Sequence, residues 1–155
     1  MAITLILIPG TYPAASKGIF DAIKKVMPKD SFIELDSASE EQLLHKKPKG
    51  KFIVIGKSAG GRLALENQIK HKDASALVLL APAVEADQKF REVKVPTLIV
   101  HGTRDDVIKL DNSKSLNKII KNSKLEIIED ADHSYKGKEI ETAKKVAVWL
   151  KTISL

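Results

Sequence analysis

Short apolar runs recur along the whole chain, separated by segments in which apolar residues return every three or four positions. Several of these runs are apolar without alternation, which is typical of strands buried on both faces of a sheet. We therefore predict strands at residues 3–8, 31–35, 52–55, 76–80, 97–100 and 125–128.

The segments between the predicted strands have the period of amphipathic helices. A helix near residues 40–44 also has a capping pattern, because Ser39 is followed three residues later by Gln42. Four apolar sets, each on one helical face, predict the other helices: Ile19, Phe20, Ile23, Val26 and Met27; Leu63, Leu65 and Ile69; Leu116, Ile119 and Ile120; and Ile140, Ala143, Val146, Ala147, Leu150 and Ile153. Strands that alternate with helices imply an α/β fold whose parallel sheet is covered on both faces and binds ligands at the carboxyl ends of its strands.

The length of 155 residues and the hydrophobic content of 43% suit one compact domain over residues 1–155. No apolar run approaches the ~18 residues of a membrane span, and residues 1–10 lack the basic start and cleavage site of a signal peptide. A cytoplasmic location without a membrane partner is therefore the default expectation. Since the chain has no cysteine, disulfides, thiolate nucleophiles and cysteine-bound zinc are excluded.

The net charge of +6 comes mainly from lysines that are scattered along the chain. A nucleic-acid site would combine a basic stripe with interleaved aromatic residues or arginines, but aromatic residues make up only 5% of this chain. We therefore interpret the densest basic run, at residues 45–51, as a solvated loop and expect no nucleic-acid partner.

The stretch G-K-S-A-G-G at residues 56–61 has two incompatible interpretations. A phosphate-binding loop, G-x-x-x-x-G-K-[ST], would need a glycine at position 51, which is occupied by Lys51. The residues before Gly56 also form a predicted strand, whereas a phosphate cradle needs its glycines in the loop itself. Nucleotide binding therefore fails on both spacing and context.

The other interpretation is G-x-S-x-G, a sharp strand-to-helix turn that exposes Ser58 as a nucleophile. Side chains two positions either side of the serine would collide in such a turn, and Gly56 and Gly60 avoid that collision. A serine hydroxyl is a weak nucleophile, so the interpretation also requires a histidine base and a carboxylate at strand ends. The alternative is that Ser58 is merely a small residue in a tight turn.

The candidate base is His133, because it is the histidine that lies in the loop after the last predicted strand. The candidate acid is Asp105, in the segment H-G-T-R-D-D-V-I that follows the predicted strand at 97–100. Asp106 is the rival acid, Asp105 could instead cap a turn, and His133 could be an ordinary surface histidine.

The segment H-G-x-x-D-x-V resembles a motif that the α/β-hydrolase superfamily often carries at this strand end, with Asp105 at its acid position. The segment A-D-H-S at 131–134 is similar to the family's base segment, and the chain order Ser58, Asp105, His133 is also the family's order. This resemblance spans nearly the whole chain. It implies a three-layer αβα sandwich with a sheet of about six parallel strands in the order 2-1-3-4-5-6.

The resemblance also implies a serine hydrolase with Ser58 as nucleophile, His133 as base and Asp105 as acid, which needs no metal or organic cofactor. Its oxyanion hole would consist of the N–H groups of Ala59 and of Thr11, or alternatively Tyr12. Pro9 departs from the histidine that is common in the family before this loop.

The resemblance is to a trimmed version of the family. Only sixteen residues separate the predicted strands at 76–80 and 97–100, where many relatives insert a helix or a lid. Because so short a segment covers little of the site, we expect an open site that accepts a small ester or thioester. The alternative function is a non-catalytic module that binds a ligand or a protein. The charged neighbours Lys57, Arg62 and Arg104 are expected to be solvated and are given no role.

Overall fold

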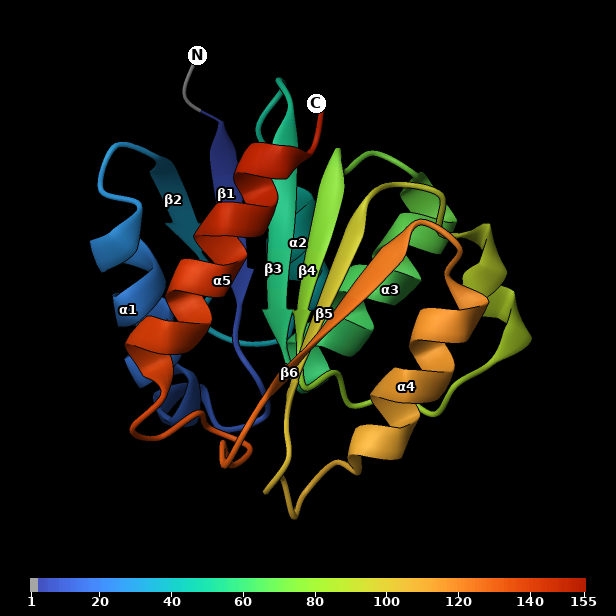
Figure 1. The fold of residues 1–155 in the computed structure, drawn as a ribbon. Coiled ribbons are helices and arrows are strands. Elements are labelled where there is room, and N and C mark those ends of the chain that lie inside the picture. Colours follow the sequence, from blue (N-terminus) through green and yellow to red (C-terminus); the bar gives the residue numbers. More distant parts are fainter. Residues whose placement is uncertain (1–2) are drawn as a thin grey trace.

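All six strands pair in parallel in the computed structural model, which describes residues 3–155 (Figure 1). The strand order is β2-β1-β3-β4-β5-β6, which confirms the predicted sheet and its topology. The strands are β1 (Thr4–Ile8), β2 (Ser31–Glu34), β3 (Phe52–Lys57), β4 (Ala76–Leu80), β5 (Thr97–Gly102) and β6 (Ser123–Ile128).

Helices cover both faces of the sheet, as predicted (Figure 1). One face packs against α1 (Lys17–Val26) and α5 (Glu139–Thr152). The other face packs against α2 (Glu40–Lys46), α3 (Ala59–His71) and α4 (Leu110–Ile119). Two short 3-10 helices, η1 (Pro13–Ser16) and η2 (Gln88–Glu92), were not predicted from the apolar pattern.

The strands that lie inside the sheet are the ones that lack alternation in the sequence. Every residue of β3, β4 and β5 is buried, because helices cover both faces there. The edge strands β2 and β6 retain exposed positions. An unbroken apolar run in this sequence therefore indicates a strand in the interior of the sheet.

Two central strands extend two residues further than the apolar pattern predicts. Strand β3 continues through Gly56 and Lys57, which pair with Leu79 and Leu80 of β4. Strand β5 continues through His101 and Gly102. Backbone hydrogen bonding to the neighbouring strands determines where β3 and β5 end, so both strands include polar residues at their carboxyl ends. Both Lys57 and His101 are buried, at 2% and 0% exposure, and the expectation that Lys57 is solvated is wrong.

The five α-helices of residues 3–155 lie where the patterns of the sequence predict them. The predicted cap of α2 forms, since the Ser39 hydroxyl accepts a hydrogen bond from the Gln42 N–H at 3.2 Å. Across residues 3–155, no helix combines the length and the apolar character needed to cross a membrane.

Candidate active site

Ser58 lies at the turn between β3 and α3, with φ of 55° and ψ of −115°. This backbone conformation is strained for a residue with a side chain, and such strain is typical of functional turns. Two glycines make the turn possible, since a Cβ on Gly56 would lie 2.3 Å from the Gly60 carbonyl oxygen and one on Gly60 would lie 2.1 Å from the Ile8 carbonyl oxygen. The glycines of the motif are therefore required by close backbone packing.

Backbone hydrogen bonds hold the strained turn in place. The Ser58 N–H donates to the Leu80 carbonyl at 2.9 Å, and the Ser58 carbonyl accepts from the amides of Gly61, Arg62 and Ala83 at 3.0, 3.2 and 2.9 Å. The turn is thus bound to its own helix and to the segment that follows β4. These bonds use only the backbone groups of Ser58, so its hydroxyl takes no part in them.

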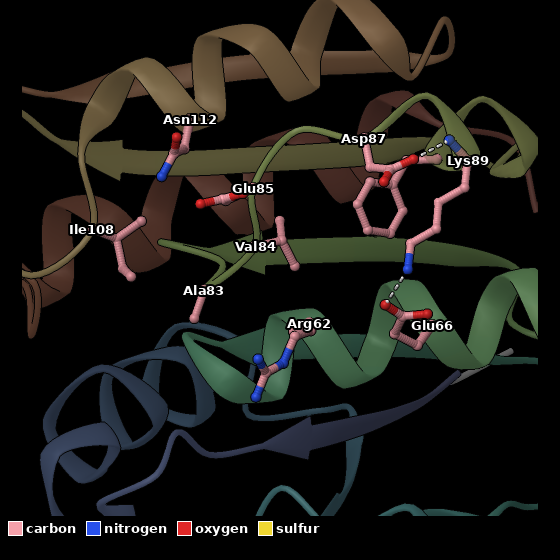
Figure 2. A pocket seen from close by; sticks show the side chains of 10 residues that line it. Arg62, Glu66, Ala83, Val84, Glu85, Asp87, Lys89, Ile108 and Asn112 are labelled. Carbon is pink, nitrogen blue, oxygen red and sulfur yellow. Dashed lines mark hydrogen bonds and ion pairs between the residues drawn. The ribbon is translucent and has the colours of Figure 1, made fainter.

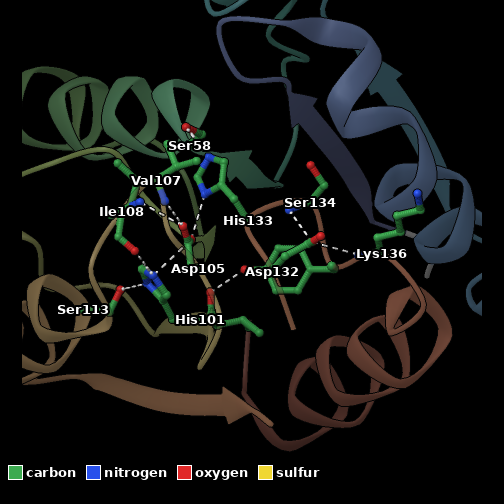
Figure 3. A network of polar contacts seen from close by, with 12 residues as sticks. Ser58, His101, Asp105, Val107, Ile108, Ser113, Asp132, His133, Ser134 and Lys136 are labelled. Carbon is green, nitrogen blue, oxygen red and sulfur yellow. Dashed lines mark hydrogen bonds and ion pairs between the residues drawn. The ribbon is translucent and has the colours of Figure 1, made fainter. Parts of the chain in front are cut away.

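The structure brings Ser58, His133 and Asp105 into one chain of polar contacts (Figure 3). The Ser58 Oγ lies 3.0 Å from the His133 Nε2, and the His133 Nδ1 lies 2.7 Å from the Asp105 Oδ2. With its proton on Nδ1, His133 donates to Asp105 and presents Nε2 as an acceptor for the serine hydroxyl. This arrangement can move a proton from Ser58 to His133.

Asp105 is fixed by more than the histidine. Its other oxygen, Oδ1, accepts hydrogen bonds from the amides of Val107 and Ile108 at 2.9 and 2.8 Å. Burial alone would raise the pKa of the Asp105 carboxyl, but hydrogen bonds from His101 and His133 and from these amides hold that pKa well below its usual range. Asp105 is therefore ionised, and it caps the turn while it contacts His133.

Asp106, the rival acid, is exposed, and it forms no ion pair with His133 among residues 3–155. The side chain of Asp105 has an exposure of 0%, against 15% for His133. The buried carboxylate and the partly accessible imidazole thus have distinct environments. The geometry separates two aspartates that the sequence alone leaves as alternatives.

His101 is a contact of Asp105 that sequence reasoning missed. Its Nε2 lies 2.8 Å from the Ile108 carbonyl and 3.2 Å from the Asp105 Oδ2, while its Nδ1 lies 2.6 Å from the Ser113 Oγ (Figure 3). A neutral ring with its proton on Nε2 satisfies these contacts, with Ser113 as donor to Nδ1. The available signal is the H-G-x-x-D motif, which places His101 at the end of a strand and four residues before Asp105.

The loops that carry Asp105 and His133 are tied to each other. The Thr103 hydroxyl accepts from the Asp130 N–H at 2.8 Å, and the Arg104 N–H donates to the Ala131 carbonyl at 2.9 Å. Gly102 permits this approach, because a Cβ there would lie 2.2 Å from the Ala131 carbonyl oxygen. The Asp105 to His133 distance is therefore set by the packing of two strand ends.

The candidate oxyanion amides lie near Ser58 on two different elements. Ala59 begins α3, so its N–H has no partner within the helix. The Gly10 N–H in the loop after β1 is already bonded to the Ser16 Oγ at 3.2 Å. Thr11 and Ala59 line one cavity of about 450 Å³, whereas Tyr12 does not line it. Thr11 and Tyr12 both line the cavity beside Ser58 and His133, so the choice between their amides as the partner of Ala59 stays a prediction.

A cavity of about 200 Å³ gives access to the serine and the histidine. It is lined by Gly10, Thr11, Tyr12, Ala15, Lys57, Ser58, Val107 and His133. Burial lowers the pKa of the Lys57 ammonium, while the charges of Asp105 and Asp132 offset this in part. The cavity is small, and its charged lining residue is a lysine.

A separate cavity of about 500 Å³ lies between the start of α3 and the segment around η2 (Figure 2). Arg62, Glu66, Lys89 and Asn112 are among its lining residues, and Lys89 pairs with Glu66 at 2.9 Å. Neither Ser58 nor His133 lines this cavity. Across residues 3–155, no three His, Asp or Glu side chains gather as metal ligands.

Comparison with known families gives one match that spans most of the chain. The model of a family described as "Alpha/beta hydrolase domain" matches residues 21–154. No curated protein sequence matches the chain significantly.

Several solved structures are similar over nearly the full length. Est1E from Butyrivibrio proteoclasticus has a TM-score of 0.81 at 16% identity, with 98% of this chain and 88% of that chain covered. The serine hydrolase CarC, involved in carbazole degradation, has a TM-score of 0.78 at 19% identity, with coverages of 98% and 92%. A thermophilic esterase from Thermogutta terrifontis has a TM-score of 0.76 at 12% identity, with coverages of 98% and 90%. Est1E is also known with ferulic acid bound. At these identities the likeness establishes a shared fold.

Proposed function

Because the chain belongs to the alpha/beta-hydrolase domain family, we propose that it is a serine hydrolase that cleaves a small carboxylic ester or thioester. The observation that carries this proposal is the contact of the His133 imidazole with both the Ser58 hydroxyl, at 3.0 Å, and the Asp105 carboxylate, at 2.7 Å. A serine on a strained turn, a histidine and a buried carboxylate are the groups that acyl transfer needs.

The first step is attack by the Ser58 Oγ on the carbonyl carbon of the substrate. His133 accepts the serine proton on Nε2 and becomes an imidazolium, which the Asp105 carboxylate stabilises. The carbonyl oxygen of the substrate becomes an oxyanion, and the amides of Ala59 and Thr11 donate to it. His133 then gives its proton to the departing alcohol or thiol, which leaves the acyl group on Ser58.

Water completes the reaction through the same groups. His133 takes a proton from the water molecule, which attacks the acyl carbon and forms a second tetrahedral intermediate. The proton then returns to the Ser58 oxygen as the carboxylic acid leaves. Asp105 stays ionised throughout, in agreement with its lowered pKa.

The dimensions of the site support a small substrate. The cavity beside Ser58 and His133 has a volume of about 200 Å³, and the segment between β4 and β5 has η2 as its sole helix. The ferulic acid that binds Est1E is itself a small carboxylic acid, which is the class of product that ester cleavage releases. Long-chain esters should therefore be poorer substrates than short ones.

A panel of esters, thioesters and a peptide amide tests the proposal when wild type is compared with Ser58→Ala. Wild type should hydrolyse short esters or thioesters, and Ser58→Ala should lower kcat by roughly 10⁴ to 10⁶ if chemistry limits the rate. A matched control is Ser75→Ala, which removes a serine hydroxyl at the opposite end of the sheet and should leave kcat unchanged. Folded wild type without activity on any member would favour a non-catalytic binding module instead.

A further inference from the structure

Lys57 is a buried charge without a partner in the cavity that holds the proposed nucleophile. Its residue exposure is 2%, and it lines the same cavity as Ser58 and His133. Across residues 3–155, no carboxylate oxygen lies within 4.0 Å of its ammonium nitrogen. A buried lysine normally has an ion-pair partner, because burial of an isolated charge is costly.

The Lys57 ammonium keeps a narrow contact with solvent. The Lys57 ammonium nitrogen has no hydrogen-bond partner within residues 3–155, and it is not fully buried. Among these residues, only the Thr142 hydroxyl is both fully buried and without a partner. The cavity that Lys57 lines connects its ammonium group with solvent. The charge is thus available to a molecule in the cavity.

The position of Lys57 follows from the extended end of β3. Side chains along a strand alternate between faces, and Ile53 and Ile55 pack on the face covered by α1 and α5. Lys57 is two residues beyond Ile55 and therefore continues this face at the carboxyl end of the strand. A methionine or leucine would fill such a position without the cost of a buried charge, so the lysine lowers stability unless a ligand pairs with it.

We propose that Lys57 is a substrate-binding residue that pairs with a carboxylate carried by the substrate close to its scissile ester or thioester bond. This inference rests on the proposed hydrolase function and adds a substrate class to it: half-esters or thioesters of small dicarboxylic acids, or esters of small hydroxy acids. A single lysine balances one negative charge. A phosphate dianion would need more donors than one lysine supplies.

Two matched substrate pairs test the inference and locate the carboxylate. Ethyl butanoate and monoethyl succinate differ by a terminal methyl against a carboxylate on the acyl side. Propyl acetate and the acetate ester of 3-hydroxypropanoate differ in the same way on the alcohol side. In one of the pairs, wild type should prefer the carboxylate ester by about 30-fold or more in kcat/KM, the size expected for a buried charge pair.

Lys57→Met should abolish this preference, measured within the variant as the ratio of kcat/KM for the two esters of the same pair. The matched control is Lys47→Met, which removes another poorly exposed lysine and should keep the preference. The melting temperature of the ligand-free protein should rise in Lys57→Met, because a buried unpaired charge is removed, and fall in Lys47→Met, because an ion pair is broken. No carboxylate preference in wild type, or an unchanged preference in Lys57→Met, would overturn the inference.

A binding measurement separates this inference from the hydrolase proposal. Monoethyl succinate or the acetate ester of 3-hydroxypropanoate should raise the melting temperature of Ser58→Ala, which needs no turnover. The shift should vanish in the Ser58→Ala, Lys57→Met double variant. If wild type hydrolyses no ester but this shift depends on Lys57, the hydrolase proposal fails and the anion site stands. A shift that persists in the double variant contradicts the role of Lys57.

Discussion

Two lysines at opposite ends of the sheet are in contrasting environments. Lys47, before β3 at the amino end, is bonded to Asp73 at 2.8 Å and to Asn67 at 3.0 Å. Lys57, at the carboxyl end of the same strand, is more deeply buried and has no such partner among residues 3–155. The lysine at the amino end is paired, whereas the lysine at the carboxyl end lines a cavity together with Ser58 and His133. The missing ion-pair partner, more than burial, therefore distinguishes Lys57 from Lys47.

Strained backbone conformations also differ between the carboxyl end and the amino end of the sheet. Non-glycine residues with positive φ at the carboxyl ends of the strands are Ser58, Ala81, Asp130 and Tyr135. At the amino end Lys72 has positive φ, and it ends helix α3 in the common left-handed conformation. At the carboxyl end the positive φ values lie in the segments that follow strands, which include the segments of Ser58 and His133, whereas the positive φ of Lys72 ends a helix.

The volume of a cavity does not show which end of the sheet holds the candidate site. A cavity of about 350 Å³ at the amino end is lined largely by apolar residues that include Val26, Ile53 and Leu150. It is larger than the cavity of about 200 Å³ beside Ser58. The smaller cavity is the better candidate because Ser58, His133 and Lys57 line it together.

A large loss of activity is expected from Asp105→Asn at the carboxyl end of the sheet. The variant keeps the shape of the side chain but favours the wrong His133 tautomer, so kcat should fall by about 10⁴. Asp106→Asn is the matched control, since that exposed neighbour should change kcat little. Steady-state kinetics on a short ester provide the measurement. Equal losses in the two variants would show that Asp105 is not the acid.

A smaller effect is expected on stability, when alanine replaces one of two glycines on either side of β3. Gly60→Ala would place its Cβ 2.1 Å from the Ile8 carbonyl oxygen, so the free energy of unfolding should fall by about 3 kcal/mol or more. Gly50→Ala, before the strand, meets no atom within 4 Å and should change stability by less than about 1 kcal/mol. Chemical denaturation of both variants measures the difference. Similar stabilities would contradict the close packing of the serine turn.

The smallest effect concerns acid stability. The pKa of Asp105 is lower in the folded protein than in the unfolded chain, so its contribution is present above about pH 4 and is lost as the pH falls further. Between about pH 5 and pH 2, wild type should lose about 2 kcal/mol more stability than Asp105→Asn. Urea unfolding across this range provides the measurement, and parallel curves for the two proteins would contradict the lowered pKa.

Much of the fold could be predicted from the sequence because its signals are local. Unbroken apolar runs such as residues 76–80 identify central strands, and G-K-S-A-G-G between a strand and a helix identifies the turn at Ser58. Asp105 and His133 could be nominated because each follows a strand, and parallel strands end at one edge of the sheet. Their mutual contact also depends on the packing of the two strand ends at Gly102 and Ala131.

The residues that escaped prediction depend on pairing between distant segments. The ends of β3 and β5 are set by the ladders with β4 and β6, so the burial of Lys57 and His101 has no apolar signal in the chain. The contact of His101 with Asp105 depends on how the loop at 103–109 folds back over the strand end. That Lys57 has no ion-pair partner within residues 3–155 can be seen only from the positions of all its neighbours.

Covalent labelling of the serine tests directly whether Ser58 is an activated nucleophile. A fluorophosphonate probe should form a stoichiometric adduct on wild type, and mass spectrometry should locate it on Ser58. Labelling should be absent in Ser58→Ala and much slower in His133→Ala, because the hydroxyl needs its base. Folded wild type that shows no adduct, or an adduct on another residue, would contradict the claim that Ser58 is an activated nucleophile.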